Sequence, residues 1–439
     1  MRARGRRWLA PAALGGAVLA ALVVPAQAAK DDLDLISRAT DGAPATGGAS
    51  FFSDISPDGR FVAFISFATN LSDADGDLVI DAFLRDTATG TTSLVSRANG
   101  QTGAGGDDRT FIAKVSADGR YVAFDSDADN LSDIDDDTMA DVFRRDTVTG
   151  ATILVTREDG PDGTPASGAA PSISDDGRLI AFQSQDDTLS AIDDNVLLNL
   201  FVRDLDAGTT TLVSRPSGAG VTPQDASSFV PVVSGDGRSV AFESDANNLT
   251  ADPTPASRDI FVRDLASGVV TLVSRATGPA GAAGDGRSTS ASISADGRYV
   301  AFSSVAANLS AQDGDPTEDV FVRDLVAGTT TLVSRAAGPA GAGGSADSQF
   351  PSISDDGRYV AFPSEAANLS PIDDDALGDI FRRDVLGVPA AAQPGPVGPG
   401  AGARAGRAAR CAGQRATIVG TARRDVLRGT RRRDVIASL

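Results

Sequence analysis

The sequence predicts an all-β fold, a six-bladed β-propeller with four-stranded antiparallel blades, from three observations. A unit of about 60 residues recurs six times, the tripeptide Asp-Gly-Arg marks each copy, and each copy contains four β-favouring segments. Self-similarity at such a period is typical of repeat folds, and four antiparallel strands per unit make one propeller blade.

The first two strands of each unit surround the tripeptide. Its copies are spaced 60, 58, 60, 60 and 60 residues apart, at 58–60, 118–120, 176–178, 236–238, 296–298 and 356–358. An apolar segment precedes each copy and an alternating segment follows it, as at 358–362. Two β-favouring segments around Asp-Gly predict a hairpin with a tight turn.

A longer polar loop then leads to a third strand, such as 319–324, and a glycine turn leads to a fourth, such as 330–335. Twelve of the nineteen Phe occupy one fixed position on the second strand and one on the third: Phe64, Phe124, Phe182, Phe242, Phe302 and Phe362, and Phe83, Phe143, Phe201, Phe261, Phe321 and Phe381. We expect them to form the core between packed sheets.

The ends of the array predict a closed ring. The fourth-strand motif Leu-Val-Ser/Thr-Arg follows the first five tripeptides but not the sixth, whereas Leu35-Ile36-Ser37-Arg38 stands alone before the first. The N-terminal strand is therefore expected to complete the last blade, which would remove a free sheet edge.

The regions outside the repeats predict export and a separate tail. Residues 1–28 combine four Arg, an apolar stretch and Ala26-Gln27-Ala28, the pattern of a cleaved signal peptide. This predicts a secreted or periplasmic, extracytoplasmic location, and no later segment is apolar enough to span a membrane. The propeller is expected over 29–387, a Pro/Gly/Ala-rich linker over 388–410 and a tail over 411–439.

Composition excludes several classes of function. The net charge is −20 although both ends are basic, so the repeat body repels nucleic acid and anionic membranes. The chain has no His and its one Cys is Cys411, which excludes Ser/His and Cys/His nucleophiles and the usual zinc sites. We expect a monomer whose partner is a protein or cell-surface ligand that the sequence does not identify.

Two resemblances follow from these motifs. Ile-Ser-Asp-Asp-Gly-Arg-Tyr-Val-Ala-Phe at 353–362, followed by Asp-Ile-Phe-Arg-Arg-Asp at 379–384, resembles the TolB-type, WD40-like (PD40) propeller repeat of bacterial exported proteins, over residues 33–386. That group includes scaffolds, binding modules and propellers attached to enzymes, so the resemblance implies fold more than function. Residues 420–428 and 429–437 resemble the haemolysin-type (RTX) calcium nonapeptide, with two of its glycines replaced, and imply a truncated or vestigial β-roll; a solvated basic tail is the alternative.

The loop between the second and third strands carries alternating Asp in several blades. The candidate metal ligands are Asp73, Asp75, Asp77 and Asp81; Asp133, Asp135, Asp137 and Asp141; Asp313, Asp315 and Asp319; and Asp373, Asp375 and Asp379. Such a pattern resembles the start of a calcium loop, since Ca²⁺ takes six to eight oxygen ligands. The favoured interpretation is that these Asp cap turns and that the Asp at the third strand pairs with a repeating Arg; calcium is the alternative.

Two further positions recur and are expected to be structural. The Asn of each Asn-Leu-Ser/Thr should cap its loop: Asn70, Asn130, Asn248, Asn308 and Asn368. The Arg that precedes the last Asp of each third strand should form an ion pair: Arg85, Arg145, Arg203, Arg263, Arg323 and Arg383.

The strand order places the short turns on one face of the ring and the long loops on the other. Long loops on a rigid scaffold are the usual place for binding. The sequence therefore predicts a non-enzymatic binding or scaffold propeller, with calcium as the candidate ion. The alternative is a carbohydrate-active hydrolase or lyase using Asp or Glu in the funnel, where Glu243 and Glu365 are the mild candidates.

Overall fold

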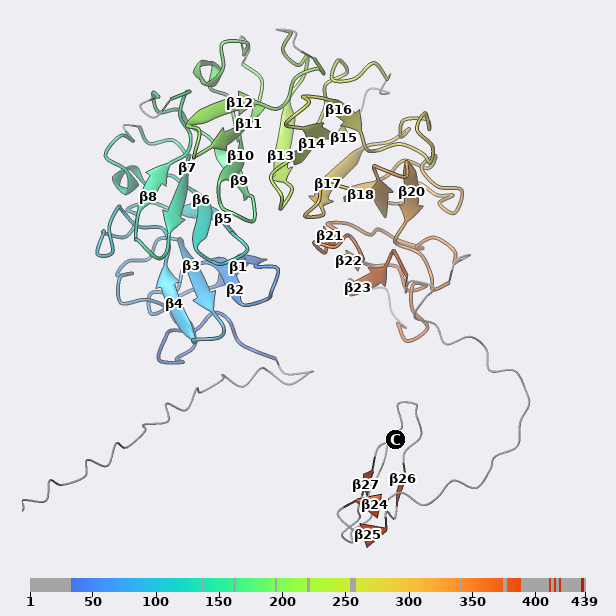
Figure 1. The fold of residues 1–439 in the computed structure, drawn as a ribbon, viewed down its shortest axis with the longest axis horizontal. Coiled ribbons are helices and arrows are strands. Elements are labelled where there is room, and N and C mark those ends of the chain that lie inside the picture. Colours follow the sequence, from blue (N-terminus) through green and yellow to red (C-terminus); the bar gives the residue numbers. More distant parts are fainter. Residues whose placement is uncertain are drawn as a thin grey trace, which may run out of the picture. The chain divides into compact units, whose positions relative to one another are not determined.

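The computed structural model describes residues 33–387 except 136, 161–162, 194–195, 219–221, 253–257, 339–340 and 374–376, together with four two-residue strands beyond residue 409. The chain divides into two compact units, residues 1–387 and 388–439. In the first unit, six antiparallel sheets follow one another around a ring (Figure 1). The only helical elements of the described part are the 3-10 turns Asp129–Leu131 and Asp187–Leu189. The predicted all-β, six-bladed architecture is confirmed.

Each sheet is one blade. Blade one contains β1 (Ser50–Ile55), β2 (Phe61–Ser66), β3 (Asp81–Asp86) and β4 (Thr91–Leu94), and blade two contains β5 (Thr110–Val115), β6 (Tyr121–Ser126), β7 (Asp141–Asp146) and β8 (Thr152–Leu154). Blade three contains β9 (Ala169–Ile173), β10 (Leu179–Ser184), β11 (Asn199–Asp204) and β12 (Thr209–Leu212). Blade four contains β13 (Ser228–Val233), β14 (Ser239–Ser244), β15 (Asp259–Asp264) and β16 (Val270–Leu272). Blade five contains β17 (Ser288–Ile293), β18 (Tyr299–Ser304), β19 (Asp319–Asp324) and β20 (Thr329–Leu332), and blade six β21 (Ser352–Ile353), β22 (Tyr359–Ser364) and β23 (Asp379–Asp384).

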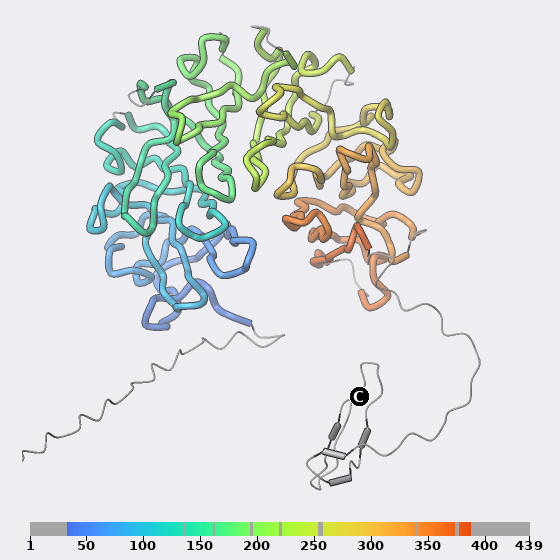
Figure 2. The backbone as a smooth tube through the Cα atoms, in the orientation of Figure 1, coloured from blue at the N-terminus to red at the C-terminus, as the bar shows by residue number. Residues whose placement is uncertain are grey.

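Within each blade the strands pair in chain order, so that the first strand lies innermost and the last outermost. The colours of Figure 2 follow the chain around the ring blade by blade. The Asp-Gly turn after each inner strand is tight: Asp58 accepts hydrogen bonds from the Ser56 hydroxyl and the Arg60 amide. Gly119 adopts a left-handed φ of 72°, and a Cβ there would lie 2.2 Å from the Phe61 ring, so the turns of blades two to six also pack closely on the preceding blade.

The twelve repeating Phe form the predicted core. In every blade the second-strand ring stacks on the third-strand ring, as in Phe182 and Phe201 with centroids 5.7 Å apart. The clusters extend across blade boundaries: Phe124 of blade two is packed with Ala63 and Leu84 of blade one. Burial of these apolar side chains therefore stabilises the packing of each blade on its neighbour.

The prediction that the recurring third-strand Arg forms an ion pair is wrong. Arg145 donates to the carbonyl oxygens of Ala98 at 2.9 Å and Gly100 at 2.9 Å, and to the Thr152 hydroxyl, so it clamps the preceding inter-blade loop. The expected ion pair with the adjacent Asp is made instead by the Asp-Gly-Arg arginine, as in Arg120 and Asp146 at 2.9 Å. The guanidinium of Arg145 is buried, and apart from the Thr152 hydroxyl its acceptors are main-chain carbonyls.

The Asn-Leu-Ser/Thr asparagines cap loops as predicted. Asn70 donates from Nδ2 to the Pro44 carbonyl and accepts at Oδ1 from the Thr46 amide at 2.7 Å. Asn130, Asn308 and Asn368 make the same donation to the loop that precedes their blade. Each Asn therefore ties the loop between strands two and three to the preceding inter-blade loop.

Within the part of the chain that the structure describes, no N-terminal strand pairs with the last blade, so the predicted closure of the ring is not formed there. The sixth sheet has three strands, and β23 pairs with β22 alone among the described residues. Residues 35–38 dock on blade one, where the carbonyl oxygen of Arg38 accepts from Arg85 and from the Thr92 hydroxyl. This is the position that Arg97 occupies on blade two. Ile380 on the open edge is 76% exposed, whereas its counterpart Val320 is fully buried.

The second unit is described only by β24 (Arg410–Cys411) and β25 (Gln414–Arg415), which are antiparallel, and β26 (Ile418–Val419) and β27 (Ile436–Ala437), which are parallel. The predicted signal peptide, linker and nearly all of the RTX-like repeat lie outside the described residues. No helix within the described part of the chain is long and apolar enough to cross a membrane.

Candidate functional site: a central channel and three carboxylate clusters

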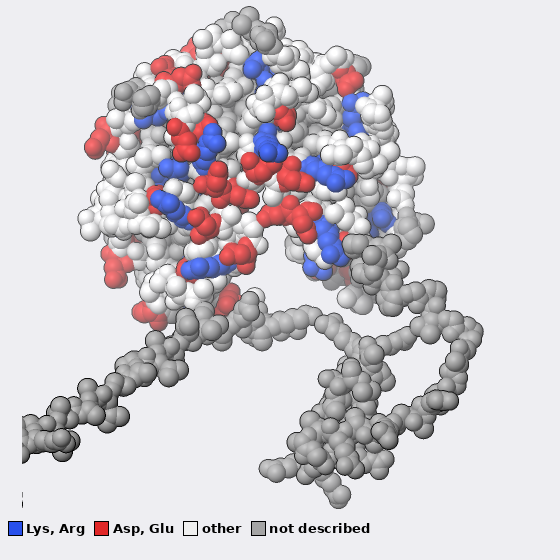
Figure 3. Space-filling view, in the orientation of Figure 1, with Lys and Arg blue, Asp and Glu red and all other residues white. Residues whose placement is uncertain are grey.

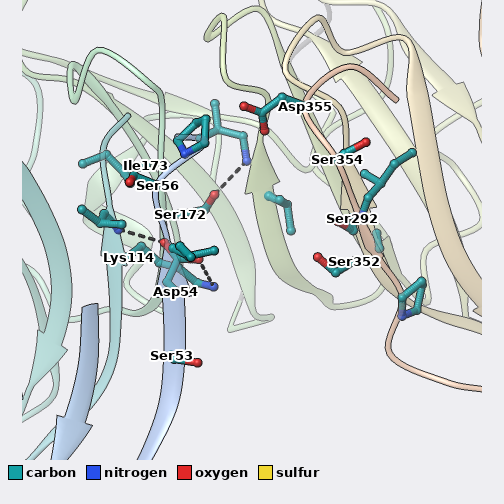
Figure 4. A pocket seen from close by; sticks show the side chains of 18 of the residues that line it. Ser53, Asp54, Ser56, Lys114, Ser172, Ile173, Ser292, Ser352, Ser354 and Asp355 are labelled. Atoms are coloured by element: carbon teal, nitrogen blue, oxygen red, sulfur yellow. Dashed lines mark hydrogen bonds and ion pairs between the residues drawn. The ribbon is translucent and has the colours of Figure 1, made fainter. Parts of the chain in front are cut away.

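The inner strands of all six blades surround a central channel. It contains a cavity of about 1040 Å³, with lining residues from β1, β5, β9, β13, β17 and β21. Pro171, Pro231 and Pro351 and the side chains of Ile173 and Ile353 make much of the wall apolar. Figure 4 shows the polar side chains that interrupt this wall.

One repeating position forms a girdle around the cavity: Asp54, Lys114, Ser172, Val232, Ser292 and Ser352. Lys114 pairs with Asp54, with 3.2 Å between Nζ and Oδ1, and the other oxygen of Asp54 accepts from the Val115 amide at 2.9 Å. Ser172 and Ser292 likewise accept from the next blade's inner strand, at the amides of Val233 and Ile353. Lys114 belongs to no recurring motif and was therefore not predicted as a site residue, although it is the only Lys in the chain besides Lys30.

The inner strands also carry a strained position. Phe52, Ala170, Val230, Ser290 and Phe350, which occupy one repeating position, all have φ between 47° and 58°. Such values cost about 1 kcal/mol or more for residues other than glycine and need support from neighbouring groups.

In three blades the support comes from the preceding blade. Asp125 accepts from the Ala170 amide at 3.0 Å and Glu243 from the Ser290 amide at 2.7 Å. Burial raises the pKa of Glu243, and burial raises that of Asp125 to about 6 even though two amides bond to its carboxylate. Glu243, a candidate of the sequence analysis, is 5% exposed and holds the neighbouring strand, whereas Glu365 is exposed.

The Asp-Gly turns join blade to blade at one end of the channel. The Asp175 amide donates to the Gly235 carbonyl, and the Ala295 amide donates to the Asp355 carbonyl. Burial, and then the negative charges of Asp355, Asp176 and Asp236, raise the pKa of Asp175. In the face shown in Figure 3, acidic side chains crowd the centre and basic side chains lie further out, next to acidic ones.

The long loops bring together three sets of predicted metal ligands. One carboxylate oxygen from each member lies within 4.8 Å of the others in Asp75, Asp77 and Asp81, in Asp135, Asp137 and Asp141, and in Asp313, Asp315 and Asp319. Asp73 and Asp133 are exposed and outside these clusters. Asp379 is exposed at the start of β23, and Asp375 lies outside the described residues.

The same Asp side chains that could bind a cation also cap turns. Asp77 and Asp315 accept from the amides two residues later, at 2.8 and 3.0 Å, as turn caps. Asp81 accepts from the Ser96 hydroxyl at 2.6 Å, so the expected pairing of this Asp with an Arg is replaced by a bond to the fourth-strand motif. Turn capping therefore uses some of the carboxylate oxygens, and one oxygen from each of the three carboxylates of a cluster still lies within 4.8 Å of the others.

The innermost carboxylate of each cluster is electrostatically unfavourable. Burial first, and then the negative charges of the other two cluster carboxylates, raise the pKa of Asp81 and Asp319 to about 7 and that of Asp141 to about 8. Blade three has an amide there instead: Asn199 donates to Asp193 at 3.0 Å. Three carboxylates need a proton or a cation to coexist, whereas the Asn–Asp pair needs neither.

The chain matches no known protein family and no curated protein. Among solved structures, it is similar to TolB from Acinetobacter baumannii, at 15% identity over 70% of this chain and 57% of that one, with a TM-score of 0.36. A putative TolB from Agrobacterium tumefaciens is 15% identical over 77% of this chain and 91% of that one, with a TM-score of 0.40. An oligogalacturonate lyase in complex with manganese is 14% identical over 75% and 73%, with a TM-score of 0.41.

The chain thus spans little more than half of the first TolB structure. The likeness concerns the fold of the TolB-type propeller, and the six blades are established by the sheets of the chain itself.

Proposed function

We propose that this chain is an exported, non-enzymatic binding or scaffold propeller whose acidic loops in blades one, two and five hold divalent cations, with Ca²⁺ as the best fit. The three carboxylate clusters carry the proposal. The signal-like residues 1–28 support export. Asp125 and Glu243 accept hydrogen bonds from main-chain amides of the next blade. This structural use of the two carboxylates supports binding rather than hydrolysis.

The donor set of each cluster suits a hard cation. Three carboxylates supply oxygen ligands, and the chain offers no His and no Cys in the repeats to attract zinc. The contrast with blade three supports the assignment, because the same position there carries the uncharged Asn199, which donates a hydrogen bond to Asp193 and adds no further negative charge.

In blade one, Asp75, Asp77 and Asp81 would hold the ion. A bound Ca²⁺ would supply positive charge that keeps Asp81 ionised. Because Asp81 begins β3 and Asp75 and Asp77 belong to the loop before it, the three side chains join the long loop to the sheet. The expected role is to order the long-loop face, where we place partner binding.

Thermal unfolding of the full chain tests the cation. At a free Ca²⁺ concentration 100 times the Kd, a site specific to the folded state adds about 2.7 kcal/mol, so three sites should raise Tm by several degrees over the chelated protein. The matched variant carries Asp77→Asn, Asp137→Asn and Asp315→Asn, which alter one exposed or half-buried ligand of each cluster. It should unfold at the same Tm with calcium and with chelator. A wild-type Tm that does not change at millimolar calcium would overturn the proposal.

A further inference from the structure

The girdle of the channel has an imbalance between hydrogen-bond donors and acceptors. Both oxygens of Asp54 are used, one by Lys114 and one by the Val115 amide. The ammonium of Lys114 has three N–H groups, and Asp54 takes one of them within the described residues.

The serines of the girdle add further donors. Ser172 and Ser292 use a lone pair to accept from the next blade, and neither hydroxyl proton is donated to another residue of the described part. β5 and β9 are neighbouring inner strands, so Lys114 and Ser172 line the same side of the cavity (Figure 4). The free hydrogen-bonding capacity here is therefore that of donors, which suits an oxygen acceptor on the ligand.

The charges around the cavity restrict the ligand further. Lys114 has 39% of its side chain exposed and is the cation of the girdle, whereas Asp355 and Asp356 line the cavity from blade six. Arg382 also lines the cavity from blade six, as these carboxylates do, and its guanidinium lies over the Tyr359 ring. A ligand with several negative charges would meet these carboxylates, but one with a single carboxylate at Lys114 would not.

The rest of the wall indicates the body of the ligand. Ile55 and Phe52 line the cavity and are 61% and 70% exposed, so apolar surface is available beside the donors. A cavity of about 1040 Å³ lies at the upper end of the usual range for small-molecule sites.

We propose that the channel binds an apolar monocarboxylate, with the carboxylate on Lys114 and Ser172 and the apolar body against Phe52 and Ile55. Two sources share this chemistry, a free aliphatic acid and the C-terminus of an apolar peptide. The site uses none of the loop carboxylates, so it stands or falls independently of the proposed cation sites.

The scarcity of lysine provides a direct assay. In a full-chain Lys30→Arg variant Lys114 is the only Lys, and reductive methylation with ¹³C-formaldehyde labels it while keeping its charge. The label on the α-amino group is assigned from the variant that carries both Lys30→Arg and Lys114→Arg. The probes are hexanoate for a free acid and N-acetyl-Val-Val for a peptide end, with hexanamide and the peptide amide as neutral controls and citrate as the polyanion.

We expect a saturable shift of the dimethyl-Lys114 resonance with at least one carboxylate probe, a far weaker response to citrate and none to the amides. Calorimetry on the unmethylated Lys30→Arg protein should then show the Kd rising about tenfold or more when Lys114→Met and Asp54→Asn are added together, a change that leaves no unpaired charge. The melting curve of that variant reports whether it is folded. No saturable shift with either acid, equal binding of acid and amide, or an unchanged Kd in the folded variant would overturn the proposal.

Discussion

Replacing the buried Asp81 by Asn should make the metal-free protein more stable at neutral pH. Burial raises the folded-state pKa of Asp81 from 3.8 to about 7. The folded chain therefore keeps a proton between pH 4 and 7 that the unfolded chain has lost, and its stability falls as pH rises through that window. A pKa change of roughly three corresponds to about 4 kcal/mol of unfolding free energy at most. Because water penetrates around the group, we expect a difference of about 2 kcal/mol.

The geometry needed by the variant already exists in blade three. Asn199 occupies the equivalent position, donates to Asp193 and accepts from the Ser214 hydroxyl, as Asp81 accepts from Ser96. Asp81→Asn should therefore keep the bond to the fourth-strand motif and remove only the titrating charge. In calcium the sign should reverse, because the variant loses a ligand.

Urea unfolding of metal-free protein between pH 4 and 9 measures the effect. Asp81→Asn should match the wild type near pH 4, exceed it by about 2 kcal/mol at pH 8 and show a smaller slope in between. Asp73→Asn, at an exposed position of the same loop, is the matched control and should leave the curve unchanged. An Asp81→Asn protein that is no more stable than the wild type at pH 8 without metal would refute the reasoning.

Three other outcomes follow from the packing of the blades. Phe182→Ala removes a fully buried stacked ring and should cost about 3–5 kcal/mol in urea unfolding, whereas loss of the exposed Phe350 ring should cost far less. Arg203→Met leaves the carbonyls of Glu158 and Gly160 without their donor and should lower the unfolding free energy by about 2–4 kcal/mol; an unchanged value would contradict the clamp. The outward-facing amides of β23 should exchange with deuterium much faster than those of β19, and equal protection would show that a strand covers this edge.

The sequence predicted those features that recur with a side-chain signature. Six tripeptides, twelve Phe and five loop asparagines define blades, core and caps, because each repeats at a fixed position and each makes the same contact in every copy where it is described. The clamp made by Arg145 could not be predicted in this way. Apart from the Thr152 hydroxyl, its acceptors are main-chain carbonyls of the preceding inter-blade loop, which any residue type provides.

The closure of the ring shows a different limit of the repeat argument. The motif at residues 35–38 predicted an outer strand for the last blade, whereas the contacts of Arg38 are with blade one, where it corresponds to Arg97 on blade two. The residues just before the motif differ from the other fourth strands in charge: Asp31, Asp32 and Asp34 lie close to Leu35 in the sequence, whereas Thr91-Thr92-Ser93 precede Leu94 in β4. Leu33 is 98% exposed.

The clearest indication of a functional residue is a side chain that does not make the hydrogen bond that its repeat position makes in other blades. Asp54, Ser172 and Ser292 each accept a hydrogen bond from the next blade, whereas Lys114 and the apolar Val232 have no side-chain acceptor to offer, and of these two only Lys114 brings a charge into the channel. A chain with Ser at both position 54 and position 114 should recover that bond, which is worth about 1 kcal/mol, and should lose a half-exposed ion pair worth no more than that. Asp54→Ser with Lys114→Ser should therefore melt at or above the wild-type Tm while losing carboxylate binding. A marked loss of stability would instead assign Lys114 a structural role in the ring, and would remove the reason to regard it as a ligand group.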